Sequence, residues 1–145
     1  PFDLAGDPIG IPGLDRVQPG GVISMIEPWI TLWSRVIYTR MHKEPFRLDA
    51  DCWEFPSTGP LSGANGALPW IIFARDLGMF SSEFPEWKVV RLEMMMPFVY
   101  LVSGGVSLRP LMPGWTWKMW RAIESFLPPD RWGMFAHITL RHTGK

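Results

Sequence analysis

Three stretches of the chain have the hydrophobic pattern of β-strands. Residues 22–26 form a short apolar run, which predicts a buried strand covered on both faces. Residues 87–94 and 134–142 instead alternate in polarity, and such alternation is typical of a strand with one face in water. One side of the last stretch carries four residues: Phe135, His137, Thr139 and Arg141.

Four other stretches repeat apolar residues every three or four positions, which predicts one buried face of a helix. They are residues 29–42, 65–77, 76–84 and 113–127. Pro69 fits only the first turn of the second helix, and Pro85 ends the third. One face of the fourth carries Trp120, Ile123, Phe126 and Leu127. The resulting order of strand, helices, strand, helix, strand predicts an α/β fold.

Proline and glycine separate these elements. Residues 1–15 are rich in both, which excludes a persistent helix or central strand and predicts an irregular N-terminal segment. Residues 44–63 are also turn-rich and form a long loop, and long loops in compact domains are commonly functional or mobile. This loop carries the carboxylates Asp49, Asp51 and Glu54.

Composition narrows the class of protein without identifying an activity. The 145 residues are enough for one domain. Lys and Arg together number 14, as do Asp and Glu, so no excess of charge favours nucleic acid as a partner. Cys52 is the one cysteine, which excludes an internal disulfide. His137 and His142 project from opposite faces of their strand, which excludes a metal site shared between them.

The chain also lacks the sequence signals of membrane insertion and secretion. No apolar run approaches the roughly 20 residues of a membrane-spanning helix, so we expect no transmembrane segment. The first residues, beginning with Pro1, carry neither an initiating methionine nor a secretory signal, and the chain looks cut from a longer protein. Together with the single cysteine, these features favour a cytoplasmic location.

A turn of proline and glycine leads into the first predicted strand. Residues 16–28 read Arg-Val-Gln-Pro-Gly-Gly and then a mainly apolar run that ends in Glu27 and Pro28. This segment resembles the turn R-V-L-K-P-G-G that leads into the fifth strand of class I S-adenosylmethionine (SAM)-dependent methyltransferases. Further blocks extend the resemblance to the C-terminal half of a subgroup of small-molecule methyltransferases, over residues 16–142. These blocks are residues 45–56, 65–73, and 103–107 with 133–136.

The resemblance implies the C-terminal part of a Rossmann-like methyltransferase sheet. By their order, residues 22–26 correspond to the fifth strand, residues 87–94 to the sixth and residues 134–142 to the seventh. The family inserts its seventh strand, antiparallel, between the other two, so the expected spatial order is fifth, seventh, sixth, with three to four helices. Residues 16–145 are then a portion of a methyltransferase-like domain, and residues 1–15 precede it.

SAM is the cofactor that the resemblance implies. Its site would require a strand, a glycine-rich turn and an acidic residue on the next strand. Gly6, Gly10 and Gly13 follow no predicted strand, so we assign no residue to cofactor binding, and none to metal binding. The chain as given is therefore expected to lack a complete SAM site and an N-terminal half, and to be inactive alone.

Two residues are candidates for acid–base catalysis. Glu27 ends the first strand, where family members place residues near the substrate, and its carboxylate can accept a proton or orient a nucleophile. The alternatives for Glu27 are a helix cap or a surface charge. His42 ends the first predicted helix and can act as a base in a substrate-facing loop. A helix C-terminus, however, favours histidine through the helix dipole alone.

Aromatic residues are candidates for binding a small-molecule methyl acceptor. Their side chains bury large areas while keeping a polar edge, so they can line an apolar acceptor pocket, and each can equally be a core residue. Asn65 joins them from the second block of the resemblance, residues 65–73. The substrate-binding candidates are Trp29, Trp33, Trp53, Asn65, Trp70 and Tyr100.

Three functions remain open. The first is the acceptor-side portion of a SAM-dependent methyltransferase that acts on a small molecule. The second is a non-catalytic interaction or dimerisation module, because without a fourth strand residues 22–26 present an open edge that tends to pair with another chain, for example in a homodimer.

The third is a membrane-surface protein, because the helix over residues 113–127 combines tryptophan with basic residues. These residues are Trp115, Trp117, Trp120, Lys118 and Arg121. Glu124 and the balanced net charge argue against this function.

Overall fold

The computed structural model describes residues 14–41, 46–51, 53, 65–104 and 113–144. Residues 1–13 of the expected irregular segment, the catalytic candidate His42, Cys52 and the loop carboxylate Glu54 lie outside them. The first described element is a short 3₁₀ helix, η1 (Leu14–Arg16).

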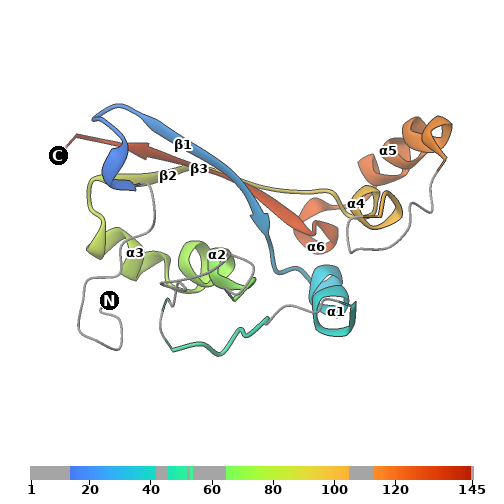
Figure 1. Cartoon of the computed structure of the whole chain (residues 1–145), viewed down its shortest axis with the longest axis horizontal. Coiled ribbons are helices and arrows are strands. Elements are labelled where there is room, and N and C mark those ends of the chain that lie inside the picture. Colours follow the sequence, from blue (N-terminus) through green and yellow to red (C-terminus); the bar gives the residue numbers. More distant parts are fainter. Residues whose placement is uncertain (1–13, 42–45, 52, 54–64, 105–112, 145) are drawn as a thin grey trace.

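The described strands form one three-stranded sheet (Figure 1). They are β1 (Val22–Pro28), β2 (Trp87–Met95) and β3 (Phe135–His142). Their spatial order is β1-β3-β2, and β3 runs antiparallel to both neighbours, so β1 and β2 point in the same direction. The three predicted strands, their order in space and the reversed direction of the last one are confirmed.

Helices lie between β1 and β2, as the apolar spacing predicts. The first is α1 (Leu32–Met41). The predicted second helix begins as α2 (Leu68–Trp70), with Pro69 in its first turn, and continues as one π-helical turn, η3 (Ile71–Arg75). The third, α3 (Leu77–Glu83), ends before Pro85. None of the helices in the described part of the chain has the length and apolar character that crossing a bilayer requires.

Between β2 and β3 the structure contains more helix than the sequence predicts. The predicted helix over residues 113–127 is the 3₁₀ turn η4 (Gly114–Thr116) followed by α5 (Trp117–Ser125). Two four-residue helices, α4 (Val99–Val102) and α6 (Pro129–Trp132), were not predicted. Four residues are too few to show a helical repeat in the sequence.

The face of α5 that turns inward differs from the predicted one. Ile123 and Phe126, assigned to a common apolar face with Trp120, are exposed, and Glu124 is buried. The grouping of these residues was wrong because Glu124 has hydrogen-bond donors inside the protein, at the start of α4. A buried carboxylate with such donors is stable where an unpaired one is not.

One face of the sheet is buried and the other is largely exposed. Ala136, Ile138 and Leu140 of β3 are fully buried, and the residues that alternate with them are more exposed, as predicted. Opposite Leu140 and Ile138 in the register lie Ile23 and Met25 of β1, which pack on the same side of the sheet. Figure 1 shows α2 and α3 on one side of the sheet.

The prediction that β1 is covered on both faces is wrong for the described structure. Val22 and Ile26 are 50% and 54% exposed, and exposure alternates along the strand. The reason is that α2 and α3 cover only the face that Ile23 and Met25 share. An apolar run does not reveal whether one or two layers of helix cover a strand.

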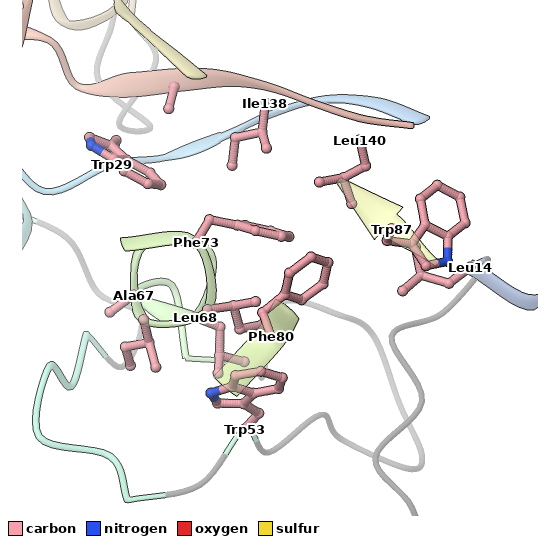
Figure 2. Close-up of a cluster of buried hydrophobic side chains, with 13 residues drawn as sticks. Leu14, Trp29, Trp53, Ala67, Leu68, Phe73, Phe80, Trp87, Ile138 and Leu140 are labelled. Carbon is pink, nitrogen blue, oxygen red and sulfur yellow. The ribbon is translucent and has the colours of Figure 1, made fainter. Parts of the chain in front are cut away.

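The main core lies between the sheet and the helices α2 and α3 (Figure 2). In it, the Phe73 ring meets the Phe80 ring edge-on at a centroid distance of 5.1 Å, a favoured geometry for aromatic pairs. Figure 2 shows both rings between Ile138 of the sheet and Trp53 of the loop that precedes α2. This core therefore joins three layers: strands, helices and loop.

The proline–glycine turn before β1 requires both of its glycines. Gly20 has φ +85°, a left-handed conformation that side chains disfavour. A Cβ at Gly21 would lie 2.4 Å from Val17 Cγ1. The Gly20 N–H donates to the His142 carbonyl and the His142 N–H donates to the Gly21 carbonyl, both at 2.9 Å. The turn therefore fastens the start of β1 to the end of β3.

Candidate functional site

The carboxyl ends of β1 and β2 lie at the same end of the sheet, because these strands point in the same direction. α1 follows β1, α4 follows β2, and α6 immediately precedes β3, so all three helices lie near this end (Figure 1). Ligands of open α/β sheets bind outside the carboxyl ends of the strands. This end is therefore the candidate functional site.

Aromatic rings hold the three helices together there. The rings of Trp33, Phe98 and Trp132, from α1, the residue before α4, and α6, lie 5.2, 5.5 and 5.8 Å apart between centroids. The Trp33 indole N–H donates to the Pro97 carbonyl at 3.0 Å. We refer to these rings, with those of Tyr38, Tyr100 and Phe135, as the strand-end cluster.

The two tyrosines of the strand-end cluster are packed. The Tyr100 ring meets the Phe135 ring edge-on at 4.6 Å. The Tyr38 hydroxyl donates to the Met134 carbonyl at 2.5 Å, and burial, with a smaller effect of Tyr100, raises the pKa of Tyr38 well above its ordinary value. Tyr38 therefore stays protonated as a hydrogen-bond donor and does not serve as a base.

Glu27 lies at the carboxyl end of β1, as predicted, and is half-buried. The register pairs it with the buried Ala136, so its side chain projects on the side of the main core. Burial raises the pKa of the Glu27 carboxyl. Among the described residues its carboxylate has no hydrogen bond and no ion pair. A carboxyl with a raised pKa and no structural partner suits acid–base chemistry.

The start of α1 is capped by residues other than Glu27. The Ser34 N–H donates to Thr31 Oγ1 at 3.1 Å and the Thr31 N–H donates to Ser34 Oγ at 2.8 Å, a reciprocal capping arrangement. Both side chains also donate to carbonyls, Thr31 to Gly133 and Ser34 to Trp29. The helix-cap alternative for Glu27 is therefore excluded at α1.

The structure divides the aromatic candidates between two regions. Trp33 and Tyr100 belong to the strand-end cluster. Trp29 and Trp53 are buried in the main core, and the half-buried Trp70 of α2 packs against it. These five residues therefore do not surround a common space. Because α2 contacts β1, Trp70 is the candidate with partial exposure on the side of the sheet that carries Glu27.

The side chain of Asn65 is engaged by the backbone. Its Oδ1 accepts hydrogen bonds from the N–H groups of Arg47 and Ala67, at 2.8 and 3.1 Å. Its Nδ2 donates to the Arg47 carbonyl at 2.6 Å. Asn65 therefore connects the loop at residue 47 to the start of α2.

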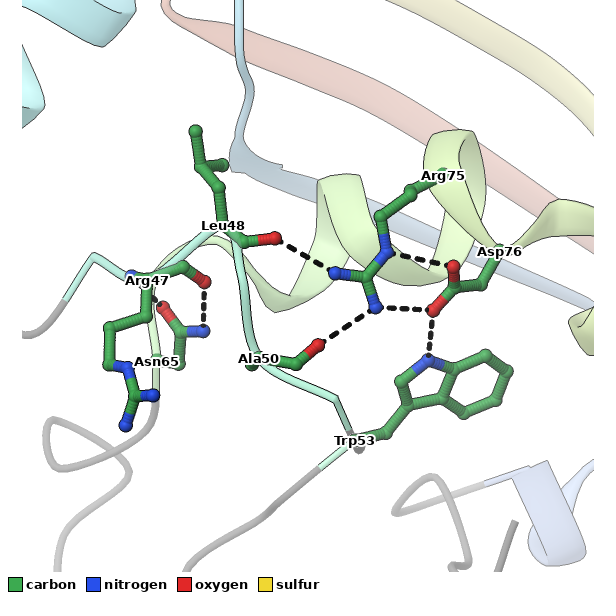
Figure 3. Close-up of polar contacts among 7 residues, drawn as sticks. All are labelled: Arg47, Leu48, Ala50, Trp53, Asn65, Arg75 and Asp76. Carbon is green, nitrogen blue, oxygen red and sulfur yellow. Dashed lines mark hydrogen bonds and ion pairs between the residues drawn. The ribbon is translucent and has the colours of Figure 1, made fainter.

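The ion pair of Arg75 and Asp76 also connects this loop to the helices (Figure 3). The Arg75 guanidinium donates to both oxygens of Asp76, at 2.8 Å each, and to the carbonyls of Leu48 and Ala50. The Trp53 indole donates to Asp76 at 3.0 Å. The Arg75 hydrogen bonds, more than that of Trp53, hold the pKa of Asp76 below its usual value. This loop was expected to be functional or mobile, but its described residues are fixed to the helices.

The site residues that sequence reasoning missed are Tyr38, Phe98, Trp132 and Phe135. Phe98 follows the predicted strand over residues 87–94 and Trp132 precedes the strand over residues 134–142. Aromatic residues just beyond a strand end were the available signal, because such positions meet at one end of a sheet. Tyr38 carried no comparable signal.

Histidine gives no metal site within the described residues. His142 lies in register with Trp87 on the buried face, and His137 lies on the other face with a hydrogen bond to Ser24 at 2.7 Å. No group of three or more His, Cys, Asp or Glu side chains among the residues described is placed to hold a metal ion. Comparison with models of protein families, with curated proteins and with solved structures finds no match for the chain.

Proposed function

We propose that residues 16–142 form the acceptor-side portion of a SAM-dependent methyltransferase that acts on a small molecule. The observation that supports it most is the strand order β1-β3-β2, with β3 antiparallel to both neighbours. Strands that follow one another in sequence usually lie adjacent, yet β1 and β2 are separated by β3. This is the arrangement that the resemblance predicts for the fifth, seventh and sixth strands of a methyltransferase.

In this proposal Glu27 is the general base. Its half-buried carboxyl has a raised pKa and no partner among the described residues, so it is available to take a proton from the acceptor nucleophile. Trp70 offers an apolar surface to the acceptor on the same side of the sheet. The strand-end cluster positions the ends of β1, β2 and β3.

The described residues do not fit SAM itself. The glycine-rich turn at Gly20 and Gly21 precedes β1, at the opposite end of the strand from Glu27, and its N–H groups are engaged by the His142 and Gln18 carbonyls. We therefore place the cofactor on polypeptide beyond the described residues, paired with β1. The outer edge of β1 has no strand beside it in the described part of the chain.

Isothermal titration calorimetry with SAM tests the proposal. The 145-residue chain alone should show no saturable binding. A longer polypeptide that includes the residues encoded upstream of Pro1 should bind SAM and transfer methyl groups. In that polypeptide, Glu27→Gln should reduce the rate of methyl transfer by about 10²–10⁴-fold. Saturable binding by the shorter chain would contradict our account of the cofactor site, and no binding by the longer one would contradict the methyltransferase.

The open edge of β1 supports a second candidate, a non-catalytic interaction or dimerisation module. Val22 and Ile26 are about half exposed on this edge strand, and such strands pair readily with other chains. Sedimentation equilibrium should then show a dimer at concentrations where a chain with Ile26→Lys is a monomer. A monomer in both cases would remove this candidate.

A further inference from the structure

The helix α5 and the turn before it expose a row of apolar side chains. Trp115 is 83% exposed and Phe126 86%, and Met119 and Ile123 are also exposed. Spacings of four, four and three residues place these positions in one stripe along the helix. Figure 1 shows α5 at one end of the molecule, far from α2 and α3. We refer to these four residues as the outer face of α5.

The inner face of α5 carries a carboxylate. The Glu124 side chain is 4% exposed. Its Oε1 accepts hydrogen bonds from the N–H groups of Phe98 and Val99, at 2.8 and 2.7 Å, and its Oε2 accepts one from Arg121 at 3.1 Å. The carboxylate therefore caps the start of α4 and is neutralised inside the protein.

The outward surface of α5 combines apolar and cationic side chains. Lys118 and Arg121 are exposed. Lys118 lies one turn from the outer-face residue Trp115, whereas Arg121 is ion-paired with Glu124. Glu124 is the single acidic residue of positions 113–127, and it is buried. The argument from Glu124 against a membrane-surface role therefore does not hold in the folded protein.

We propose that the outer face of α5 docks onto the surface of an anionic lipid bilayer. Tryptophan is favoured at the level of the lipid headgroups, and Met119 and Phe126 suit the boundary of the acyl chains. Lys118, beside the stripe, meets the anionic headgroups. This docking requires no SAM and does not depend on the methyltransferase proposal.

A second copy of the chain is the competing occupant of this face, and two arguments disfavour it. Packing two outer faces together would bring the Lys118 side chains of both copies near one another, which is repulsive. The stripe also runs for only about 16 Å of helix, whereas a stable interface takes about 800 Å² from each partner. An anionic bilayer matches both the apolar stripe and the cationic Lys118 next to it.

Flotation with lipid vesicles tests this proposal on the 145-residue chain. Vesicles of phosphatidylcholine mixed with phosphatidylglycerol should carry the protein upward, and vesicles of phosphatidylcholine alone should carry much less. The double substitution Trp115→Ser with Phe126→Ser should weaken binding at least about tenfold, because it removes the largest apolar groups of the outer face. Lys118→Glu should remove the preference for anionic vesicles.

The matched control removes exposed apolar side chains elsewhere. Leu32→Ser with Met79→Ser changes exposed residues of α1 and α3 and should leave vesicle binding unchanged. Thermal melting followed by circular dichroism checks that each variant folds. Three outcomes would each overturn the proposal. The control variant could lose as much vesicle binding as the Trp115 and Phe126 variant, or the unchanged protein could fail to float with anionic vesicles. Alternatively, the protein could self-associate without binding vesicles, and the Trp115 and Phe126 substitutions could abolish that self-association.

Discussion

The segment α2 to α3 and the helix α5 turn opposite kinds of side chain toward the rest of the protein. The former buries Ile71, Phe73 and Phe80, and the latter, with the residues that flank it, exposes Trp115 and Phe126. An apolar face next to the sheet stabilises the fold, since burial removes it from water. An apolar face left in water does not, and its presence needs another explanation, such as docking.

Carboxylates sharpen this comparison. Asp76, between η3 and α3, and Glu124, in α5, are both shielded from solvent and both satisfied by N–H donors and a neighbouring arginine. Glu27 is half-buried without such donors among the described residues. Shielded charge with a full set of partners has a structural role, whereas the shielded Glu27 without such partners is the basis of our proposal for a general base.

The largest expected effect separates two tryptophans. Trp53→Ala should destabilise the protein by about 3–5 kcal/mol, because it empties a fully buried position of the main core. Trp115→Ala should change the free energy of unfolding by less than about 0.5 kcal/mol, since the ring lies in water. Urea denaturation measures both. Similar losses of stability in the two variants would contradict the contrast between a buried main core and an exposed outer face of α5.

Next in size is the loss of the Glu124 cap. Glu124→Ala should destabilise the protein by about 2–3 kcal/mol, because the half-buried N–H of Phe98 and the buried N–H of Val99 lose their acceptor. The neighbouring Ser125→Ala, at an exposed position, is the control and should be nearly neutral. If both substitutions are neutral in urea denaturation, Glu124 does not hold α5 in this orientation.

A smaller effect, with a defined pH dependence, is expected at Asp76. A pKa lowered by folding stabilises the protein above the unfolded-state pKa, and this stabilisation is lost as pH falls through the folded-state pKa. Asp76→Asn should therefore cost about 1–2 kcal/mol at neutral pH and little in acid below the lowered folded-state pKa, which is less than 3.8. Urea unfolding curves of the protein and the variant at the two pH values measure this difference. An equal loss of stability at both pH values would contradict a stabilising role for the charge of Asp76.

The smallest effect, of opposite sign, is expected at Glu27. Burial raises its pKa, so the stability of the folded state declines as pH rises through that raised pKa, above 4.5. Glu27→Gln should then melt at a slightly higher temperature at neutral pH and at the same temperature in acid. Glu93→Gln is the control, because Glu93 is exposed and paired with Arg91. A loss of stability in Glu27→Gln would show that the carboxylate has a structural partner.

The sequence predicted the strands well because their patterns depend on near neighbours. Ala136, Ile138 and Leu140 alternate with polar residues, and this reports the buried face directly. Glu27 was likewise placed at a strand end. The order β1-β3-β2 followed from the resemblance alone, since no local pattern specifies which strand lies in the middle.

The strand-end cluster and the inward turn of Glu124 could not be predicted, because both depend on contacts between distant residues. Trp33, Phe98 and Trp132 meet only after three helices have packed. The amphipathic pattern of α5 shows that one side of the helix is more polar than the other. The backbone N–H groups of Phe98 and Val99, which bind Glu124, determine which side faces inward. An aromatic residue in the sequence is expected to be buried, but the sequence does not indicate in which cluster its ring packs.

The pairing of β1 with β3 has a consequence for synthesis of the protein. Ser24 and His137, which are hydrogen-bonded diagonally across the two strands, are 113 positions apart. Ribosomes add about 5–20 residues per second, so β1 waits roughly 6–23 s for its partner. During that time Ile23 and Met25 lack their neighbours on β3, Leu140 and Ile138. Such long-range pairing slows folding, and nascent chains of this protein are expected to depend on a chaperone until β3 emerges.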